Sequence, residues 1–218
     1  VDPDKDQSYV LGVLTAEQIA HSMFPLGDST KTQVREEAER RGILVAQKPD
    51  SHDICFIPDG DTAGWLSRQI ETVPGDVLDA ETGVKVGTHQ GAQAFTVGQR
   101  RGLALGNPLG DGERRYVVDV DVKSNIVKVG PPALLEVNVI EAVNPIWAGV
   151  QPPQQSRIHV QIRAHGEALP ATVEFTPELV TLTLDANIRG VAAGQAAVLY
   201  DGTRVIGSAT ISRTRRQN

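Results

Sequence analysis

The spacing of apolar and polar positions indicates that helices dominate the beginning of the chain. Thr15 precedes a run of good helix formers, and a second helix is expected over about 29–41, with polar caps before it and Gly42 to end it. The apolar run 42–46 then predicts a short buried strand. Because a helix followed by such a strand is typical of an α/β layer, residues 1–61 are expected to belong to an α/β domain.

The pattern changes at about residue 62 to short apolar runs separated by glycine- and proline-rich turns. The run 116–122, the polar segment 123–125 and the run 126–129 together predict a β-hairpin. We therefore expect a small, β-rich central domain over 62–149.

The polar, proline-bearing segment 151–155 is typical of a linker, and an all-β pattern follows it. Apolar and polar residues alternate from Arg157 to Arg163, which predicts a strand with one buried and one solvated face. Further strands are expected at 172–175, 179–184, 197–200 and 205–211. Such short strands at close spacing favour a C-terminal β-barrel over 150–218, so the fold class is α+β and mostly β.

The charge distribution leaves a nucleic-acid partner open. The formal net charge is −6, but seven arginines and five acidic residues give the segment from Trp147 onward a charge of +2. A mildly basic end on an acidic chain suits a local phosphate contact, and an ordinary solvated surface would carry the same charges. No apolar run approaches the ~20 residues that span a bilayer, so no membrane segment is expected.

Cys55 is the single cysteine, so no disulfide can form within the chain, which favours a reducing cytoplasm. Ile54 and Phe56 flank it, as they would a small buried hydrophobe. His52 and Lys48 would favour a reactive thiolate if they approach the sulfur, so both interpretations stay open. The five histidines lack the spacing of metal ligands, and no metal is expected.

A glycine-bounded turn follows the apolar segment that begins at Phe95. Gly98 and Gly102 enclose Gln99, Arg100 and Arg101, whose amide and guanidinium groups match phosphate geometry, although an ordinary exposed turn would contain the same residues. The sequence contains no Walker A loop, no Gly-x-Gly-x-x-Gly and no Ser-Gly-Gly-x-Asp-Ser loop. A self-contained ATP site is therefore not expected.

Five stretches taken together resemble the tRNA-specific 2-thiouridylase family, in its order and approximate spacing. They are Lys5-Asp6-Gln7-Ser8-Tyr9, Phe24-Pro25-Leu26-Gly27 with Lys31, Val34 and Arg35, Asp53-Ile54-Cys55-Phe56-Ile57, Gly98-Gln99-Arg100-Arg101-Gly102-Leu103, and Tyr116-Val117-Val118-Asp119. The resemblance extends over nearly all 218 residues. It implies a C-terminal fragment of such an enzyme, in which residues 1–61 are the end of an ATP-pyrophosphatase domain.

The resemblance implies an ATP-dependent sulfur transfer. The family adenylates the C2 oxygen of the wobble uridine of tRNA, with ATP and magnesium, and replaces that oxygen with a persulfide sulfur from a carrier protein. It makes Cys55 the catalytic, persulfide-bearing cysteine. Because the ATP-binding loop and the first catalytic cysteine would precede Val1, this chain alone is expected to be inactive.

The resemblance also implies tRNA-binding residues, namely Lys5, Asp6, Gln7, Arg163, Ala164 and Gln195, with Gln99 and Arg100 as support. Ala164 lacks the aromatic ring usual at its position, so stacking there is not expected. A cytoplasmic monomer that binds tRNA and a sulfur carrier follows. Two alternatives from other classes remain, a non-catalytic RNA-binding β-barrel module and a structural adaptor.

Overall fold

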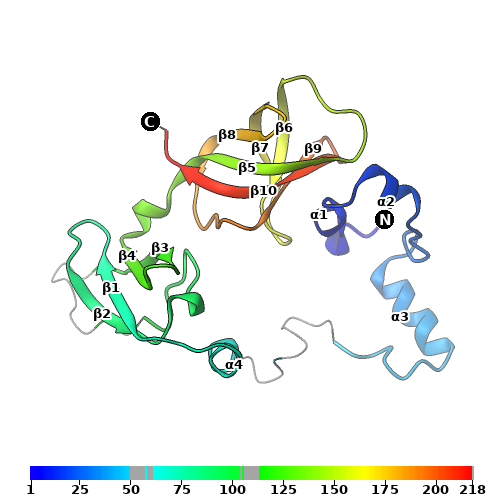
Figure 1. Ribbon diagram of the computed structural model, residues 1–218. Helices are drawn as coiled ribbons and strands as arrows, with labels where there is room; N and C mark the ends of the chain where they lie inside the picture. The colour runs from blue at the N-terminus through cyan, green and yellow to red at the C-terminus, as the bar shows by residue number, and fades with distance from the viewer. Residues whose placement is uncertain (50–56, 58–60, 104, 106–112, 218) are drawn as a thin grey trace. The chain divides into compact units, whose positions relative to one another are not determined.

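The computed structural model describes residues 1–218 apart from 50–56, 58–60, 104, 106–112 and 218 (Figure 1). The α-helices are α1 (Ser8–Leu11), α2 (Ala16–Ala20), α3 (Lys31–Arg40) and α4 (Thr62–Gln69), and single 3-10 turns are η1 (Pro3–Lys5), η2 (Ala92–Ala94) and η3 (Pro132–Leu135). The strands are β1 (Gly75–Asp79), β2 (Lys85–His89), β3 (Tyr116–Asp121), β4 (Ile126–Gly130), β5 (Val137–Trp147), β6 (Gln155–Gln161), β7 (Leu169–Phe175), β8 (Leu179–Ile188), β9 (Ala196–Asp201) and β10 (Arg204–Arg215). Strands outnumber helices among the described residues, which confirms the α+β, mostly β class.

The chain forms two compact units, and each unit combines stretches that are distant in sequence. One contains Val1–His52, Glu141–Asp185 and Gly194–Ser212, and the other contains Asp53–Ile140, Ala186–Ala193 and Arg213–Asn218. The first unit therefore holds the N-terminal helices together with most of the barrel.

Capping residues set the bounds of α2 and α3. The hydroxyls of Thr15 and Thr30 accept hydrogen bonds from the backbone amides of Gln18 and Gln33, whose side chains bond back to the capping residues. Each pair is a capping box, which satisfies two amides at the helix start. Gly42 follows α3 with φ +68°. Both predicted helices and the glycine stop are confirmed.

The buried strand predicted over 42–46 is wrong. The segment forms turns, with hydrogen bonds from the Ala46 amide to the Ile43 carbonyl and from the Lys48 amide to the Val45 carbonyl. The side chain of Leu44 is fully exposed, and only Ala46 is buried. A strand needs a neighbouring strand, and none pairs with this segment among the described residues.

Residues 75–130 supply a four-stranded sheet in the order β2-β1-β4-β3. Strands β1 and β4 are parallel, while β1–β2 and β3–β4 are antiparallel pairs. The β3–β4 hairpin confirms the prediction. Its turn is closed by the Asp121 carboxylate, which accepts from the amides of Lys123 and Ser124, and by Asn125 at φ +56°.

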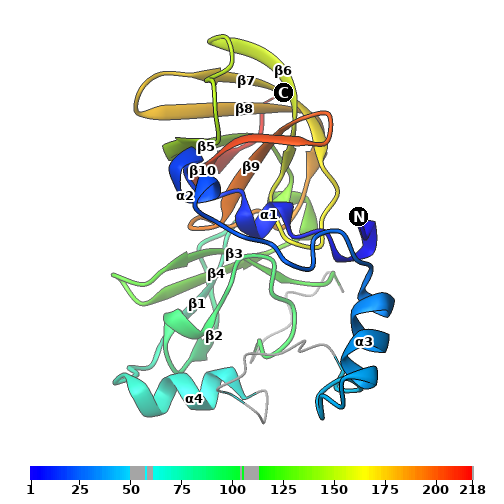
Figure 2. The same cartoon turned by 90° about the vertical axis from the view of Figure 1, so that its right-hand side faces the viewer.

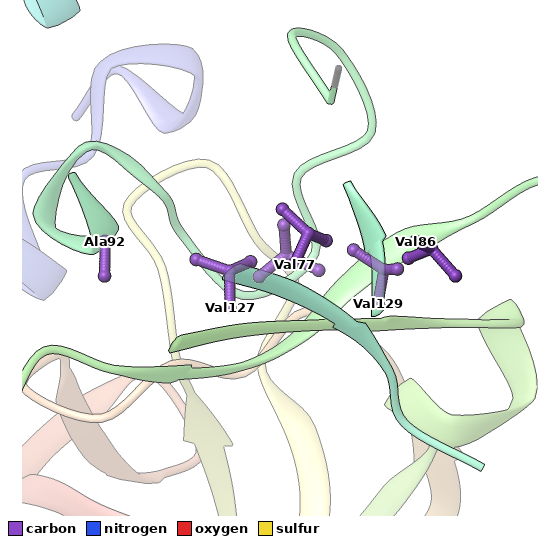
Figure 3. Close-up of a cluster of buried hydrophobic side chains, with 6 residues drawn as sticks. Val77, Val86, Ala92, Val127 and Val129 are labelled. Atoms are coloured by element: carbon purple, nitrogen blue, oxygen red, sulfur yellow. The ribbon is translucent and has the colours of Figure 1, made fainter. Parts of the chain in front are cut away.

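A compact apolar cluster holds this sheet together. The cluster shown in Figure 3 consists of Val77, Val86, Ala92, Val117, Val127 and Val129, each at most 4% exposed. Burying a valine side chain contributes roughly 1.5–3 kcal/mol, so these valines from all four strands stabilise the sheet substantially. Helix α4, in the same unit, begins after Asp61, whose carboxylate accepts from the Gly64 amide. The sequence pattern did not predict this helix.

Strands β5 to β10 close into a six-stranded barrel in the order β10-β5-β8-β7-β6-β9, which confirms the predicted barrel (Figure 1). Ile158 and Val160 of β6 are buried, while Arg157 and His159 are exposed, as the alternation predicts. The barrel also includes β5, which begins at Val137, ahead of the polar segment used to place a boundary at 150. No helix among the described residues is long and apolar enough to cross a membrane.

Candidate nucleic-acid interface

The segment around α1 lies against strand β9 of the barrel (Figure 2). The Ser8 hydroxyl lies 3.0 Å from the Tyr200 hydroxyl, and the Tyr9 hydroxyl donates to the Ala196 carbonyl at 3.0 Å. A Cβ atom at Gly12 would lie 2.6 Å from the Val198 side chain, so only glycine permits this approach. The residues before α1 are thereby fixed on the barrel.

A cavity of about 570 Å³ opens between this segment and the turn that follows β6. Its lining is mostly polar. It consists of Pro3, Asp4, Lys5, Asp6, Gln7, Ser8, Tyr9, Gln161, Ala164, His165 and Gly166. Four residues predicted from the sequence as tRNA contacts therefore line one cavity, namely Lys5, Asp6, Gln7 and Ala164. More than 150 positions separate the first three from Ala164 in sequence.

The side chain of Gln161 shapes the far wall of the cavity. Its amide nitrogen donates to the carbonyls of Arg163 and Ala164, at 3.0 and 3.3 Å, and the Gly166 amide donates to the Arg163 carbonyl. Its oxygen accepts from the Tyr200 hydroxyl at 2.9 Å. Because that hydroxyl has one proton, the Ser8 hydroxyl is the donor in its own bond to Tyr200.

The near wall is fixed by Asp6. One oxygen of its carboxylate accepts from the Ser8 amide at 2.7 Å, which holds the backbone from Asp6 to Ser8 in a turn. The side chain of Lys5 is exposed at the edge of the cavity. An exposed ammonium beside amide and hydroxyl groups suits a ribose–phosphate chain, in which anionic oxygens alternate with neutral donors and acceptors.

Arg163 and Gln195 border the same interface. The positive charge of Arg163 acts to lower the pKa of the Tyr9 hydroxyl, although burial and Tyr200 raise it overall. Gln195 directly precedes Ala196, the residue whose carbonyl binds Tyr9, and the Gln195 carbonyl accepts from the Ile211 amide at 2.8 Å. The structure thus brings all three predicted groups of tRNA contacts to one region.

The hydroxyls of the buried Tyr200 and the half-buried Tyr9 are both held in the neutral form. Burial raises the pKa of Tyr200, with a further increase from Asp6 and an opposing effect of the hydrogen bond with Ser8. Burial is also the largest cause of the raised pKa of Tyr9. The hydrogen bonds of these two hydroxyls therefore persist throughout the neutral pH range.

The predicted turn at Gln99 and Arg100 belongs to the other compact unit. The Gln99 side chain is used within its own turn, accepting from the Thr96 amide at 3.1 Å and donating to the Arg101 carbonyl at 2.9 Å. Gly98 and Gly102 have φ values of +90° and +76°, so both glycines are required by the backbone. Arg100 is exposed at the tip and remains able to contact an anion.

Cys55, the predicted persulfide cysteine, lies outside the described residues. Within the described part of the chain, no three histidine, cysteine, aspartate or glutamate side chains are grouped to hold a metal ion. The start of α3 also offers no phosphate site, because Asp2 and Thr30 accept from its first amides. Asp61 does the same for α4.

Sequence reasoning missed three residues that organise the interface, namely Tyr9, Gln161 and Tyr200. Tyr9 stood in a motif of the resemblance without a role, and Gln161 was one polar residue on an alternating strand. Tyr200 ended an apolar run and looked like an ordinary strand residue. In the structure it is only 5% exposed. A buried tyrosine needs a partner for its hydroxyl, and that requirement was the available signal.

Three family models match consecutive parts of the chain. Their descriptions are a tRNA methyl transferase HUP domain at residues 1–59, a tRNA methyl transferase PRC-barrel domain at 63–131 and an aminomethyltransferase beta-barrel domain at 137–211. The last match begins at β5, in agreement with the strand composition of the barrel.

Curated proteins named tRNA-specific 2-thiouridylase MnmA are similar to almost the whole chain. The protein of Salinispora tropica is 57% identical over 97% of this chain, that of Acidothermus cellulolyticus 55% over 99%, and that of Arthrobacter sp. 54% over 97%. The matched regions cover 60%, 59% and 59% of those relatives. The chain thus spans about three fifths of the length of these relatives.

Proposed function

Because the chain belongs to the tRNA-specific 2-thiouridylase family, we propose that it supplies the tRNA-binding and sulfur-donating parts of an enzyme that forms 2-thiouridine in tRNA. The observation that supports this proposal best is the shared cavity at Lys5–Gln7 and Ala164, with Arg163 and Gln195 beside it. The family's tRNA contacts, carried over residue by residue, converge there from three separate stretches of sequence.

In the proposed complex, Lys5 and Arg163 bind phosphate groups of the tRNA, and Gln7 and Gln195 bind sugar or base edges. Asp6 has two roles in this proposal. One of its oxygens accepts from the Ser8 amide and sets the backbone, and the other binds a donor on the RNA, because a carboxylate would repel phosphate.

The proposed chemical role belongs to Cys55. Its thiolate would take the outer sulfur of a carrier protein's persulfide, and the carrier's thiolate would leave. The terminal sulfur of the new persulfide would attack C2 of the wobble uridine, and the adenylated oxygen would leave as AMP. The thiolate of the family's first catalytic cysteine would then attack the sulfur of Cys55, which breaks the S–S bond, leaves one sulfur on C2 and joins the two cysteines in a disulfide. ATP and magnesium would be bound by the region of the enzyme that corresponds to the part of the relatives not matched by this chain. We place the reaction in the cytoplasm, where thiols stay reduced, and propose a monomer.

Binding of tRNA to the chain as a function of salt tests the first half of the proposal. We expect a dissociation constant that rises steeply between 50 and 200 mM salt, by roughly tenfold or more if two or three phosphates are contacted. A DNA duplex of equal length serves as the control ligand. Equal affinity for both ligands, or binding that is insensitive to salt, would contradict a specific tRNA interface.

Substitution of Cys55 tests the second half. Cys55→Ser, made in the whole protein, should abolish formation of 2-thiouridine in tRNA while the affinity for tRNA stays nearly unchanged, because a hydroxyl cannot carry a persulfide. Analysis of modified nucleosides measures the product. Substantial 2-thiouridine from the variant would rule out Cys55 as the sulfur donor, and a chain that binds tRNA without ever carrying a persulfide would be the RNA-binding module of the alternative.

A further inference from the structure

The bond network centred on Tyr200 joins the two walls of the cavity. On one side its hydroxyl accepts from Ser8, the residue that follows Lys5–Gln7, and on the other it donates to Gln161, which holds the turn of Arg163 and Ala164. Ser8 and Tyr200 are 192 positions apart in sequence. Tyr200 therefore binds both the residue that follows one predicted tRNA-binding segment and the side chain that holds the other.

From this placement we infer that Tyr200 is a positioning residue for tRNA binding, which acts through its hydrogen bonds with Ser8 and Gln161. It rests on the proposed function and extends it to a residue, Tyr200, that does not itself line the cavity. Tyr200 is 5% exposed and lies on a barrel strand whose neighbours Leu199 and Val198 are fully buried. A hydroxyl fixed on so rigid a strand can hold two exposed segments in one relative arrangement.

The burial of Tyr200 explains why one hydroxyl suffices. An exposed Ser8–Gln161 contact would compete with water, whereas a bond to a buried hydroxyl does so much less. Each surface segment needs only one anchor, because Asp6 and the Gly166 amide already fold the segments internally. Preorganisation of this kind lowers the entropic cost of ordering the two protein segments when the RNA binds.

The test uses three variants of the full chain, each of which removes one part of the network. Tyr200→Phe keeps the ring and removes both bonds, Ser8→Ala releases only the first segment, and Gln161→Met releases only the turn. Tyr116→Phe, which removes a tyrosine hydroxyl from β3 in the other unit, is the matched control. Amide hydrogen exchange and tRNA affinity are measured on all four variants.

We expect Tyr200→Phe to speed exchange at the amides of both Ser8 and Gly166 and to weaken tRNA binding by roughly fivefold to tenfold, the equivalent of one or two net hydrogen bonds. Ser8→Ala should affect only the Ser8 side, and Gln161→Met only the Gly166 side. Amides of β9 should stay protected in every variant, which shows that the barrel is intact.

A double substitution separates positioning from general destabilisation. If Tyr200 acts through the tRNA-binding segments, Tyr200→Phe should cost less affinity in an Arg163→Ala background than in the wild type. Equal losses in both backgrounds, or wild-type exchange at Ser8 and Gly166 in Tyr200→Phe, overturn the inference. The tRNA affinity of the wild-type chain is measured before that of any variant. A wild-type chain that does not bind tRNA overturns the proposed function itself.

Discussion

Arg163 lies in the turn after β6, next to Ala164, which lines the cavity, and Gln195 directly precedes Ala196, which binds the Tyr9 hydroxyl. One ligand should therefore respond to the loss of either side chain. We expect Arg163→Ala and Gln195→Ala each to weaken tRNA binding by roughly 1–2 kcal/mol, the usual range for a charge-assisted or neutral hydrogen bond. The arginine effect should shrink at high salt, because phosphate contacts act by releasing counterions. A salt series of binding isotherms measures both effects.

Arg157→Ala is the control for that pair. Arg157 stands on β6 and pairs with Asp185 on the barrel, so its loss changes the net charge by the same amount as Arg163→Ala. The control should leave tRNA affinity within about twofold of the wild type, since distant exposed charges are largely screened. If Arg163→Ala and Arg157→Ala weaken binding equally, general charge and not the cavity attracts the RNA.

At the scale of the element, α1 depends on a glycine. A Cβ at Gly12 would meet a γ-methyl group of Val198 at 2.6 Å and the Ser8 carbonyl at 3.1 Å, and Val198 is a buried β-branched residue that cannot turn aside easily. Gly12→Ala should therefore push α1 away from β9 at a cost of roughly 1–3 kcal/mol. The measurable results are faster exchange at α1 and weaker tRNA binding.

Gly149→Ala is the matched substitution, because a Cβ at Gly149 would have no atom within 4 Å. It should change neither quantity. The barrel amides should stay protected from exchange in both variants. In Gly12→Ala the clash with Val198 is relieved by movement of the four-residue helix α1. Unchanged protection of α1 in Gly12→Ala would mean that β9 yields instead, and that α1 is held more firmly than its few contacts indicate.

The four-stranded sheet should depend on Asp79, which is 2% exposed at the end of β1. Burial acts to raise its pKa, but hydrogen bonds from Thr82 and Glu81 and the nearby Arg115 outweigh burial, so the pKa is lowered overall. A carboxyl whose pKa is lower in the folded state stabilises the fold above its unfolded pKa of about 3.9, and this contribution is lost as the pH falls through the folded value.

Asp79→Asn should therefore reduce the loss of stability between about pH 4 and pH 2 relative to the wild type. At neutral pH the variant should be less stable, by up to roughly 3–5 kcal/mol, because the nearly buried Arg115 loses the opposite charge 3.8 Å away. Thermal unfolding over a pH series measures both effects. Identical pH profiles for the two proteins would show that the Asp79 charge does not contribute to folding.

Local chemistry determined which elements were predictable from the sequence. Thr30, Gly42 and the 123–125 turn act on residues within a few positions of themselves, so the ends of α3 and the β3–β4 hairpin were predicted correctly. The apolar run at 43–45 failed because burial depends on a partner elsewhere in space. The link from Ser8 to Tyr200 spans 192 positions, so the cavity that it supports was not predictable, even though four of the residues that line it were predicted as tRNA contacts.

At the scale of the whole molecule, residues 1–49 bury far fewer side chains than the barrel does. Among Val1–Pro49, only Gly12 and Ala46 are buried, and α2 and α3 bury no residue at all. Isolated helices of 5 and 10 residues are marginal in water, since most helical stability in proteins comes from packing. The barrel, by contrast, buries side chains from all six of its strands.

Hydrogen exchange on the chain should therefore divide it into three classes. Barrel amides should exchange slowest, amides of the docked α1 at an intermediate rate, and amides of α2 and α3 fastest, close to the rates of an unstructured peptide. The capping boxes at Thr15 and Thr30 stabilise each helix by only about 1 kcal/mol and cannot supply global protection. Mass spectrometry of peptides from 16–20 and 31–40 reads this directly. Protection there equal to that of β9 would require packing partners for α2 and α3 that the described residues do not provide, and would show that residues 1–49 fold as firmly as the barrel.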